Sequence, residues 1–317
     1  MATTIDNISP TQLYSVSDEI ISLPVPFMIH GTPARKRYLK SRGGDTLAQI
    51  GYEALEPAIT PLDNIGVDLK PQQPKKYNVF TKVQQYGTYV RLEELVTLQN
   101  QEDVLAILAE RFAICLRESE DILARSVLES SASEIYCSAG VNNDRPTDLS
   151  RADVNDVVKL LALNSAHKFT DPIFGSPQYG TGPIRGSILA LGSSELIGQL
   201  EDIDGFKYTS EYPVKSDADI LQAEYGAISN MRFLLSPLGT VYENSSTLGM
   251  NVYGIHCTSP DAFSIVEQTG YTQELIYRPP AYVDPLGRSC EMGIRFSFGG
   301  GITNDLWVYK LLCTLRG

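Results

Sequence analysis

The sequence predicts an α+β fold, in which helices and strands occupy separate stretches instead of alternating. Three observations support this prediction. Two strand-like stretches separated by a Pro-rich segment come first, a long stretch with helical periodicity follows them, and short strand-like stretches dominate after residue 227. The chain has 317 residues, of which 43% are hydrophobic and 20% are charged, so it can bury a substantial core.

The first 30 residues predict an extended arm. Pro10, Pro24 and Pro26 interrupt them, no period is sustained, and the basic start and apolar core of a secretory signal are missing. The best apolar run, residues 20–29, is shorter than the roughly 20 residues that span a bilayer. We therefore expect no membrane partner.

A dense basic cluster follows the arm, and it has two interpretations. The cluster contains Arg35, Lys36, Arg37, Lys40 and Arg42. It could contact nucleic-acid phosphates, or form ion pairs with an acidic surface of a neighbouring copy. The formal net charge of −12 argues against a protein whose main task is to bind nucleic acid, because that binding depends on Lys and Arg.

The segment Arg42–Thr46 spells RGGDT, close to the RGGDEF signature of diguanylate cyclases. A cyclase hairpin needs an acidic residue directly after the aspartate, where this chain has Thr46. It also needs an upstream lobe that binds the base, which the short irregular arm cannot form. We expect instead that Gly43 and Gly44 permit a sharp chain reversal, or a close backbone approach, where the arm turns into the hairpin. A nucleotide-handling enzyme that uses Arg42–Thr46 remains an alternative.

Two strand-like stretches, 46–55 and 77–92, flank the Pro-rich segment 56–76 and predict a long hairpin with a broad tip. The second stretch is rich in β-branched and aromatic residues, which favour strands. A tip of this length is typical of a binding loop or of an arm that leaves the domain.

Residues 100–130 predict one helix, which at this length would extend for about 45 Å. Asn100 is the expected N-cap. A ladder of alternating charge at i, i+4 spacing, made by Arg117, Asp121, Arg125 and Glu129, is expected on one stripe. The apolar stripe comprises Leu105, Leu108, Phe112, Cys115, Leu116, Ile122, Leu123 and Val127.

Ser150, with Asp153 three residues later, predicts the start of a second helix that continues through Leu161. A strand over 187–192 and a short helix from Ser193 follow. The later strands are expected within residues 228–237, 250–259, 272–279, 290–298 and 306–315. Because a strand precedes Gly299–Gly301 and another follows, we expect a bulge or turn there and no phosphate cradle.

The sequence contains no recognisable catalytic or metal motif. The three histidines are far apart in the sequence, and the five cysteines, which we interpret as reduced thiols, lack C-x-x-C spacing. We expect no cofactor, no metal and no enzymatic activity. An arm, a projecting hairpin and an oversized helix instead favour a subunit that interlocks with copies of itself.

Several stretches together resemble the major capsid proteins of tailed phages, and most of all the N-four-like coat family. The stretches are RGGDTL, LEPAITPL, QYGTYVRLEEL, ERFAICLRESEDILARSVL, YGAISNMRF, VDPLGRSCEMGIRF and LWVYKL. The resemblance is good from about residue 35 to 128 and again from 225 to 312, and it is thin between these ranges. The sequence departs from the family at residues 63–66, where the family has a Glu-Gly pair, and in the loop 169–185.

The resemblance implies the Hong Kong-97-like capsid fold and a division of the chain. Residues 1–40 would form the N-terminal arm and 41–80 the extended hairpin loop that reaches over an adjacent subunit. Residues 81–149 and 261–317 would form the peripheral domain, with its spine helix at 100–130, and the late strands would return to its sheet. Residues 150–260 would be mainly the axial domain.

The implied function is that of a major capsid protein, which assembles through hexamers and pentamers into an icosahedral shell around double-stranded DNA. The other implied partners are a portal, scaffolding or decoration proteins, and weakly bound DNA; the implied location is the virion capsid, assembled in the host cytoplasm. An encapsulin-like cargo container of the same fold is the main alternative. The expected inter-subunit residues are Arg35, Lys36, Arg37, Arg42, Gly43, Gly44, Asp45, Pro57, Pro61, Lys75 and Lys76.

Overall fold

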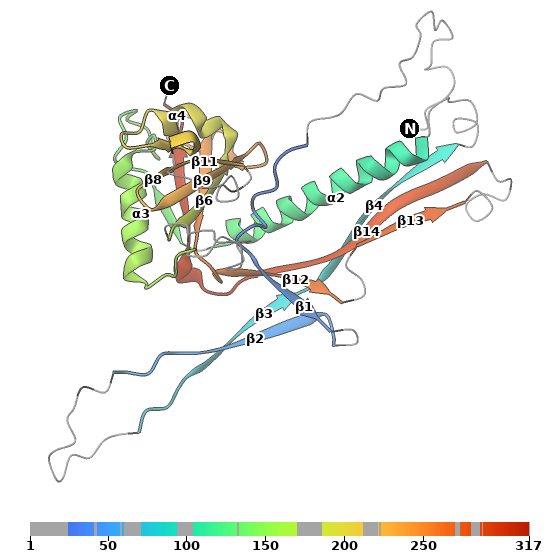
Figure 1. Cartoon of the computed structure of the whole chain (residues 1–317), viewed down its shortest axis with the longest axis horizontal. Helices are drawn as coiled ribbons and strands as arrows, with labels where there is room; N and C mark the ends of the chain where they lie inside the picture. Colours follow the sequence, from blue (N-terminus) through green and yellow to red (C-terminus); the bar gives the residue numbers. More distant parts are fainter. Residues whose placement is uncertain are drawn as a thin grey trace, which may run out of the picture.

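A computed structural model shows an elongated α+β molecule with a sheet domain at one side and a hairpin and a helix-covered ribbon that extend in opposite directions (Figure 1). The structure describes residues 25–40, 43–57, 59, 71–93, 104–131, 133–169, 186–211, 221, 223–269, 273–279, 286 and 288–316. Among these residues, no helix is both long and apolar enough to cross a bilayer.

The larger sheet has eight strands in the order β5-β15-β11-β6-β9-β8-β7, with β10 paired to β11. Its strands are β5 (Glu134–Tyr136), β6 (Ile188–Ser193), β7 (Lys207–Tyr208), β8 (Glu224–Ile228), β9 (Met231–Ser236), β10 (Thr240–Tyr242), β11 (Val252–Thr258) and β15 (Val308–Thr314). Helix α3 (Arg151–Leu163) packs Val154, Val157 and Leu161 into the core of this sheet. This part of the molecule therefore has a hydrophobic core of its own.

Two sequence predictions in this region are confirmed. Ser150 caps α3 in a capping box, in which its hydroxyl accepts from the Asp153 N–H and the Asp153 carboxylate accepts from the Ser150 N–H. After β6, Ser193 caps the 3-10 turn η3 (Ser194–Leu196), which leads into α4 (Ile197–Glu201). Two further 3-10 turns are η4 (Thr209–Glu211) and η6 (Asp305–Trp307).

The smaller sheet is built around the 14-residue strand β14. Its strands are β1 (Arg35–Leu39), β4 (Gln84–Glu93), β12 (Phe263–Gln268), β13 (Gln273–Arg278) and β14 (Ser289–Ile302). One edge of β14 pairs with β4, and the other pairs first with β13 and then with β12. The implied return of every late strand to this sheet is wrong for β15, which pairs with β11 in the eight-stranded sheet.

Helix α2 (Val104–Glu129) lies along the ribbon made by β4, β13 and β14 (Figure 1). Phe112 packs on Met292 and Ile294 of β14, and Leu128 packs in a second cluster nearer the large sheet. The predicted apolar stripe is confirmed except at Ile122, which is 40% exposed. The predicted N-cap Asn100 lies outside the described residues. The predicted charge ladder is wrong at Asp121, which is buried.

The predicted hairpin is present, although its second strand is shorter than expected. β2 (Thr46–Tyr52) pairs antiparallel with β3 (Lys76–Lys82) in a separate two-stranded sheet. The single strand predicted over 77–92 is interrupted at Val83, where β3 ends and the chain continues as β4. Most of the Pro-rich tip, 58 and 60–70, lies outside the described residues.

The predicted bulge or turn at Gly299–Gly301 is wrong, because β14 continues through these glycines and pairs with β12. The reason is packing on both faces. A Cβ atom on Gly300 would lie 2.3 Å from Val127 Cγ2 of α2, and one on Gly301 would lie 2.6 Å from Thr81 Oγ1 of β3. The glycines let the helix and the base of the hairpin cross the same strand closely.

Candidate assembly surfaces

Three residues of the basic cluster, Arg35, Lys36 and Arg37, lie on β1, a strand that the sequence pattern did not predict. Arg35 Nη1 is 2.8 Å from Asp261 Oδ1, in the turn before β12. Lys36 lies near Glu120 of α2: partial burial raises the pKa of Glu120, and the positive charge of Lys36 opposes that shift. Arg37 lines a hollow beside the hairpin. Arg35 thus has an intrachain partner, and both interpretations of the cluster stay predictions.

Gly43 and Gly44 form the turn between β1 and β2, which confirms the predicted chain reversal. Gly44 has φ of +88°, in the region that favours glycine. A Cβ atom on Gly43 would lie 2.9 Å from the backbone oxygen of Lys40. The turn directs the chain from the smaller sheet into the hairpin, and Arg42, just before it, is outside the described residues.

Asp45 closes the base of the hairpin. Its backbone oxygen accepts a hydrogen bond from the Val83 N–H at 2.8 Å, and its carboxylate lies 3.5 Å from Lys82 Nζ. The Thr46 hydroxyl donates to the carboxylate, and this bond together with the Lys82 charge lowers the pKa of Asp45. The charge partner of Asp45 in the structure therefore belongs to the same hairpin.

Of the remaining predicted residues, Pro57, Lys75 and Lys76 are exposed on the hairpin, and Pro61 is outside the described residues. Lys75 Nζ lies 3.8 Å from Glu53 Oε2, a solvent-exposed pair that holds the two strands only weakly. Lys76 stands opposite Tyr52 in the strand register.

One face of the hairpin is apolar and uncovered by the rest of the described chain. Ala48, Ile50 and Tyr52 alternate along β2 and so share a face, and Phe80 stands directly opposite Ala48. Ile50, Tyr52 and Phe80 are 58%, 64% and 67% exposed. A two-stranded hairpin is marginally stable alone in water, so apolar side chains arranged in this way favour a partner surface.

A second exposed surface lies on the ribbon, on the face opposite α2. Met292 and Ile294 point toward α2, so Gly293 between them points to the other face. Gly293 pairs with Tyr89 of β4 and with Ile276 of β13. Together with Arg278 these residues line a groove of about 540 Å³. Tyr89 is 67% exposed at its wall.

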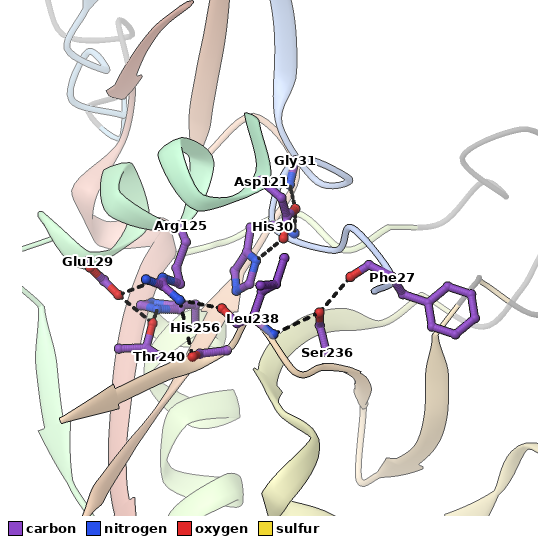
Figure 2. Close-up of polar contacts among 11 residues, drawn as sticks. Phe27, His30, Gly31, Asp121, Arg125, Glu129, Ser236, Leu238, Thr240 and His256 are labelled. Carbon is purple, nitrogen blue, oxygen red and sulfur yellow. Dashed lines mark hydrogen bonds and ion pairs between the residues drawn. The ribbon is translucent and has the colours of Figure 1, made fainter. Parts of the chain in front are cut away.

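The arm segment, residues 25–34, is anchored to α2 by one carboxylate (Figure 2). Asp121 Oδ1 accepts from the backbone N–H of His30 at 2.8 Å and of Gly31 at 3.4 Å. Asp121 Oδ2 lies 2.7 Å from His30 Nδ1. The Ser236 hydroxyl donates to the Phe27 carbonyl oxygen at 2.7 Å. Asp121 thus satisfies arm donors and takes no part in the helix ladder.

The polar contacts continue from α2 to the large sheet. Arg125 Nη1 donates to the Leu238 carbonyl oxygen at 2.6 Å, and Arg125 Nε lies 3.2 Å from Glu129 Oε1. The Thr240 hydroxyl is 2.7 Å from the same Glu129 oxygen and 2.8 Å from His256 Nε2 of β11. Figure 2 shows that the arm, α2 and the β9–β11 region meet at this network.

Solved structures of phage capsids match the chain over nearly its full length. With the capsid of Ralstonia phage GP4 the TM-score is 0.68 at 11% identity, covering 100% of this chain and 99% of the other. For the capsid asymmetric unit of cyanophage Pam1 the TM-score is 0.65 at 13% identity, with 100% of both chains covered. The chain has the Hong Kong-97-like capsid fold.

A chain of Mycobacterium phage Che8 is also similar, with TM-score 0.63 at 14% identity over 97% of this chain and 98% of that one. No protein-family model matches the sequence, and no curated protein sequence does. The capsid fold is therefore established by structure, and the N-four-like assignment stays a prediction.

The hairpin was predictable from the sequence, whereas the groove and the arm anchor were not. The groove depends on which faces of β4, β13 and β14 remain open, and that follows from pairing between distant segments. The arm anchor joins His30 to Asp121, 91 residues apart, and places the rings of His30 and His256 side by side. Among the described residues no group of three or more potential metal ligands forms.

Proposed function

We propose that this chain is the major capsid protein of a tailed double-stranded DNA phage and that it forms the icosahedral shell around the genome. One observation carries the proposal: a chain with a capsid fold extends a hairpin whose apolar face has no cover within the described chain. Full burial of an exposed apolar side chain contributes about 1.5–3 kcal/mol, so covering the exposed parts of Ile50, Tyr52 and Phe80 with a neighbour would contribute up to about that amount for each.

The shape of the subunit favours a head-to-tail contact between copies. β3 ends at Lys82 and β4 begins at Gln84, so the hairpin and the groove-lining residues 85–89 lie on opposite sides of Val83 along a nearly continuous strand. A hairpin directed away from the groove of its own chain can reach such a groove only on another copy. Heterologous contacts form rings when the rotation between copies closes, as hexamers and pentamers require.

The division of the chain belongs to the same proposal. Residues 1–40 act as the N-terminal arm and 41–80 as the loop that clasps the neighbour. Residues 81–149 and 261–317 form the peripheral domain, except for β5 and β15, which pair in the eight-stranded sheet. Residues 150–260 form mainly the axial domain around the capsomer centre. Many modest contacts per subunit give a shell that is collectively stable while each contact can be corrected during assembly.

The proposed partners follow from this role. They are other copies of the chain, a portal, scaffolding or decoration proteins, and packaged DNA held by weak contacts. The net charge of −12 suits an inner wall that does not retain DNA strongly. The proposed location is the virion capsid, after assembly in the host cytoplasm.

Negative-stain electron microscopy of the purified full-length chain at high concentration tests this function. The proposal predicts closed shells or capsomer-sized rings, and monomers at every concentration would contradict it. Particles that contain enzymes in place of DNA would identify the encapsulin-like container. Turnover of a nucleoside triphosphate that is lost in Asp45→Ala would identify the nucleotide-handling alternative.

A further inference from the structure

Two of the three histidines meet inside the arm anchor, although 226 residues separate them. The ring centroids of His30 and His256 are 6.3 Å apart at an interplanar angle of 74°. Both side chains are fully buried. His30 belongs to the arm segment, and His256 lies on β11 in the centre of the large sheet. Their contact therefore joins the arm to the domain built on the eight-stranded sheet, which we call the body of the subunit (Figure 2).

The hydrogen bonds determine where an added proton would go on each ring. The Glu129 carboxylate can only accept, so the Thr240 hydroxyl donates its one proton to it. The same hydroxyl must therefore accept a hydrogen bond from His256 Nε2–H. This leaves Nδ1 as the nitrogen of His256 that carries the free lone pair. In His30, Nδ1 faces Asp121, so the free lone pair is on Nε2. Both remaining nitrogens are buried without a hydrogen-bond partner in the described part of the chain.

The charged groups around His256 also oppose a second proton. Arg125 of α2 and Lys310 of β15, which pairs with His256 in the sheet, are cations, and His30 approaches from the arm. The nearby anions are engaged: Asp121 by the arm, and Glu129 by Arg125 and Thr240. The β6 neighbour in the register is Leu191, which is apolar. Burial, followed by the charges of His30, Lys310 and Arg125, lowers the pKa of His256 to about 3.

We propose that the His30–His256 pair is an acid-sensitive latch that holds the arm segment on the body at neutral pH and releases it in acid. Protonation of His256 would bury a positive charge beside Arg125 and Lys310, together with an Nδ1–H group that has no acceptor among the described residues, and release of the arm hydrates both. The folded-state pKa of His256 lies below its free value of 6.5, so the latched state binds fewer protons than the released state between these values. The latch therefore weakens as pH falls through this window, by up to tenfold in the opening equilibrium for each pH unit.

Amide hydrogen exchange of the full-length, unassembled chain between pH 7.5 and 5.0, corrected for intrinsic rates, tests the latch. The reporters are the N–H groups of His30 and Gly31, which donate to Asp121. The key variant is His256→Gln, whose amide can still donate to Thr240 but does not titrate. The matched control is His167→Gln, since His167 contacts Trp307 outside the network.

The wild-type chain and His167→Gln should lose protection of both amides as pH falls, approaching tenfold per unit toward pH 5, while β6 and β9 stay protected. His256→Gln should show no such slope. If His256→Gln does not fold, His256→Asn, which also does not titrate, should show no slope at Gly31. Constant wild-type protection down to pH 5, an unchanged slope in the variant, or equal loss in β6 and β9 would overturn the proposal. Because the readout does not require shells, it is independent of the proposed capsid function.

Discussion

Phe233 on β9 and Phe80 on β3 are the same type of residue, but one is buried and the other is exposed. Phe233 is fully buried in the core between the large sheet and α3, whereas Phe80 is 67% exposed on the hairpin. The first contributes to the stability of one subunit, and the second can contribute only when another molecule covers it. Apolar residues of the large sheet thus stabilise the folded subunit, whereas those of the hairpin are available for assembly.

The largest expected effect separates these two regions directly. Phe233→Ala should lower the free energy of unfolding by about 3–5 kcal/mol, because it leaves a cavity in a closed core. Phe80→Ala should change it by less than about 0.5 kcal/mol. Chemical denaturation of both variants measures the difference. A similar loss in both would show that the hairpin is part of the subunit core.

The next effect is expected in the smaller sheet, where α2 packs closely on β14. Gly300→Ala should destabilise the chain by about 1–3 kcal/mol, because its Cβ would lie 2.3 Å from Val127 Cγ2. The control is Gly198→Ala, a position with no atom within 4 Å of the new Cβ. Thermal unfolding should separate the two variants clearly. Equal midpoints would mean that α2 and β14 are not held in close contact.

A smaller effect is expected at the start of α3, within the body. Ser150→Ala removes the side-chain acceptor of the capping box and should cost about 1 kcal/mol in unfolding free energy. Ser150→Thr, which retains the hydroxyl, should recover most of that loss in the same denaturation experiment. If the alanine variant had the same unfolding free energy as the wild type, the capping box would not contribute to the stability of the body.

The smallest effect is expected at the hairpin base. Asp45 and Lys82 are both exposed, and ion pairs of this kind contribute little to stability. Asp45→Asn should leave the thermal midpoint of the subunit unchanged in differential scanning calorimetry. A clear drop in that midpoint would show that the hairpin is coupled to the body more strongly than its contacts indicate.

Local signals in the sequence were sufficient for the elements that local chemistry determines. The helical period placed α2, the Ser150–Asp153 box placed the start of α3, and two adjacent glycines placed the turn before β2. β1 was missed because its sequence is basic and its strand forms only by parallel pairing with β12.

The errors have the same physical origin, since tertiary contacts override local preference. Gly299–Gly301 suggested a bulge, but α2 and β3 require a strand without side chains there. Asp121 fitted a helix ladder, but an arm segment 91 residues away uses its carboxylate. The groove could not be predicted at all, because it depends on the register of three strands.

The central claim is that the exposed hairpin face is buried between copies of the chain. Sedimentation velocity combined with electron microscopy of Ile50→Asp/Phe80→Asp tests it, with Ile50→Val as the control that keeps the face apolar. We predict a double variant that unfolds at the wild-type midpoint yet sediments only as unassembled subunits, while the control forms shells. Normal shells from the double variant would contradict the account.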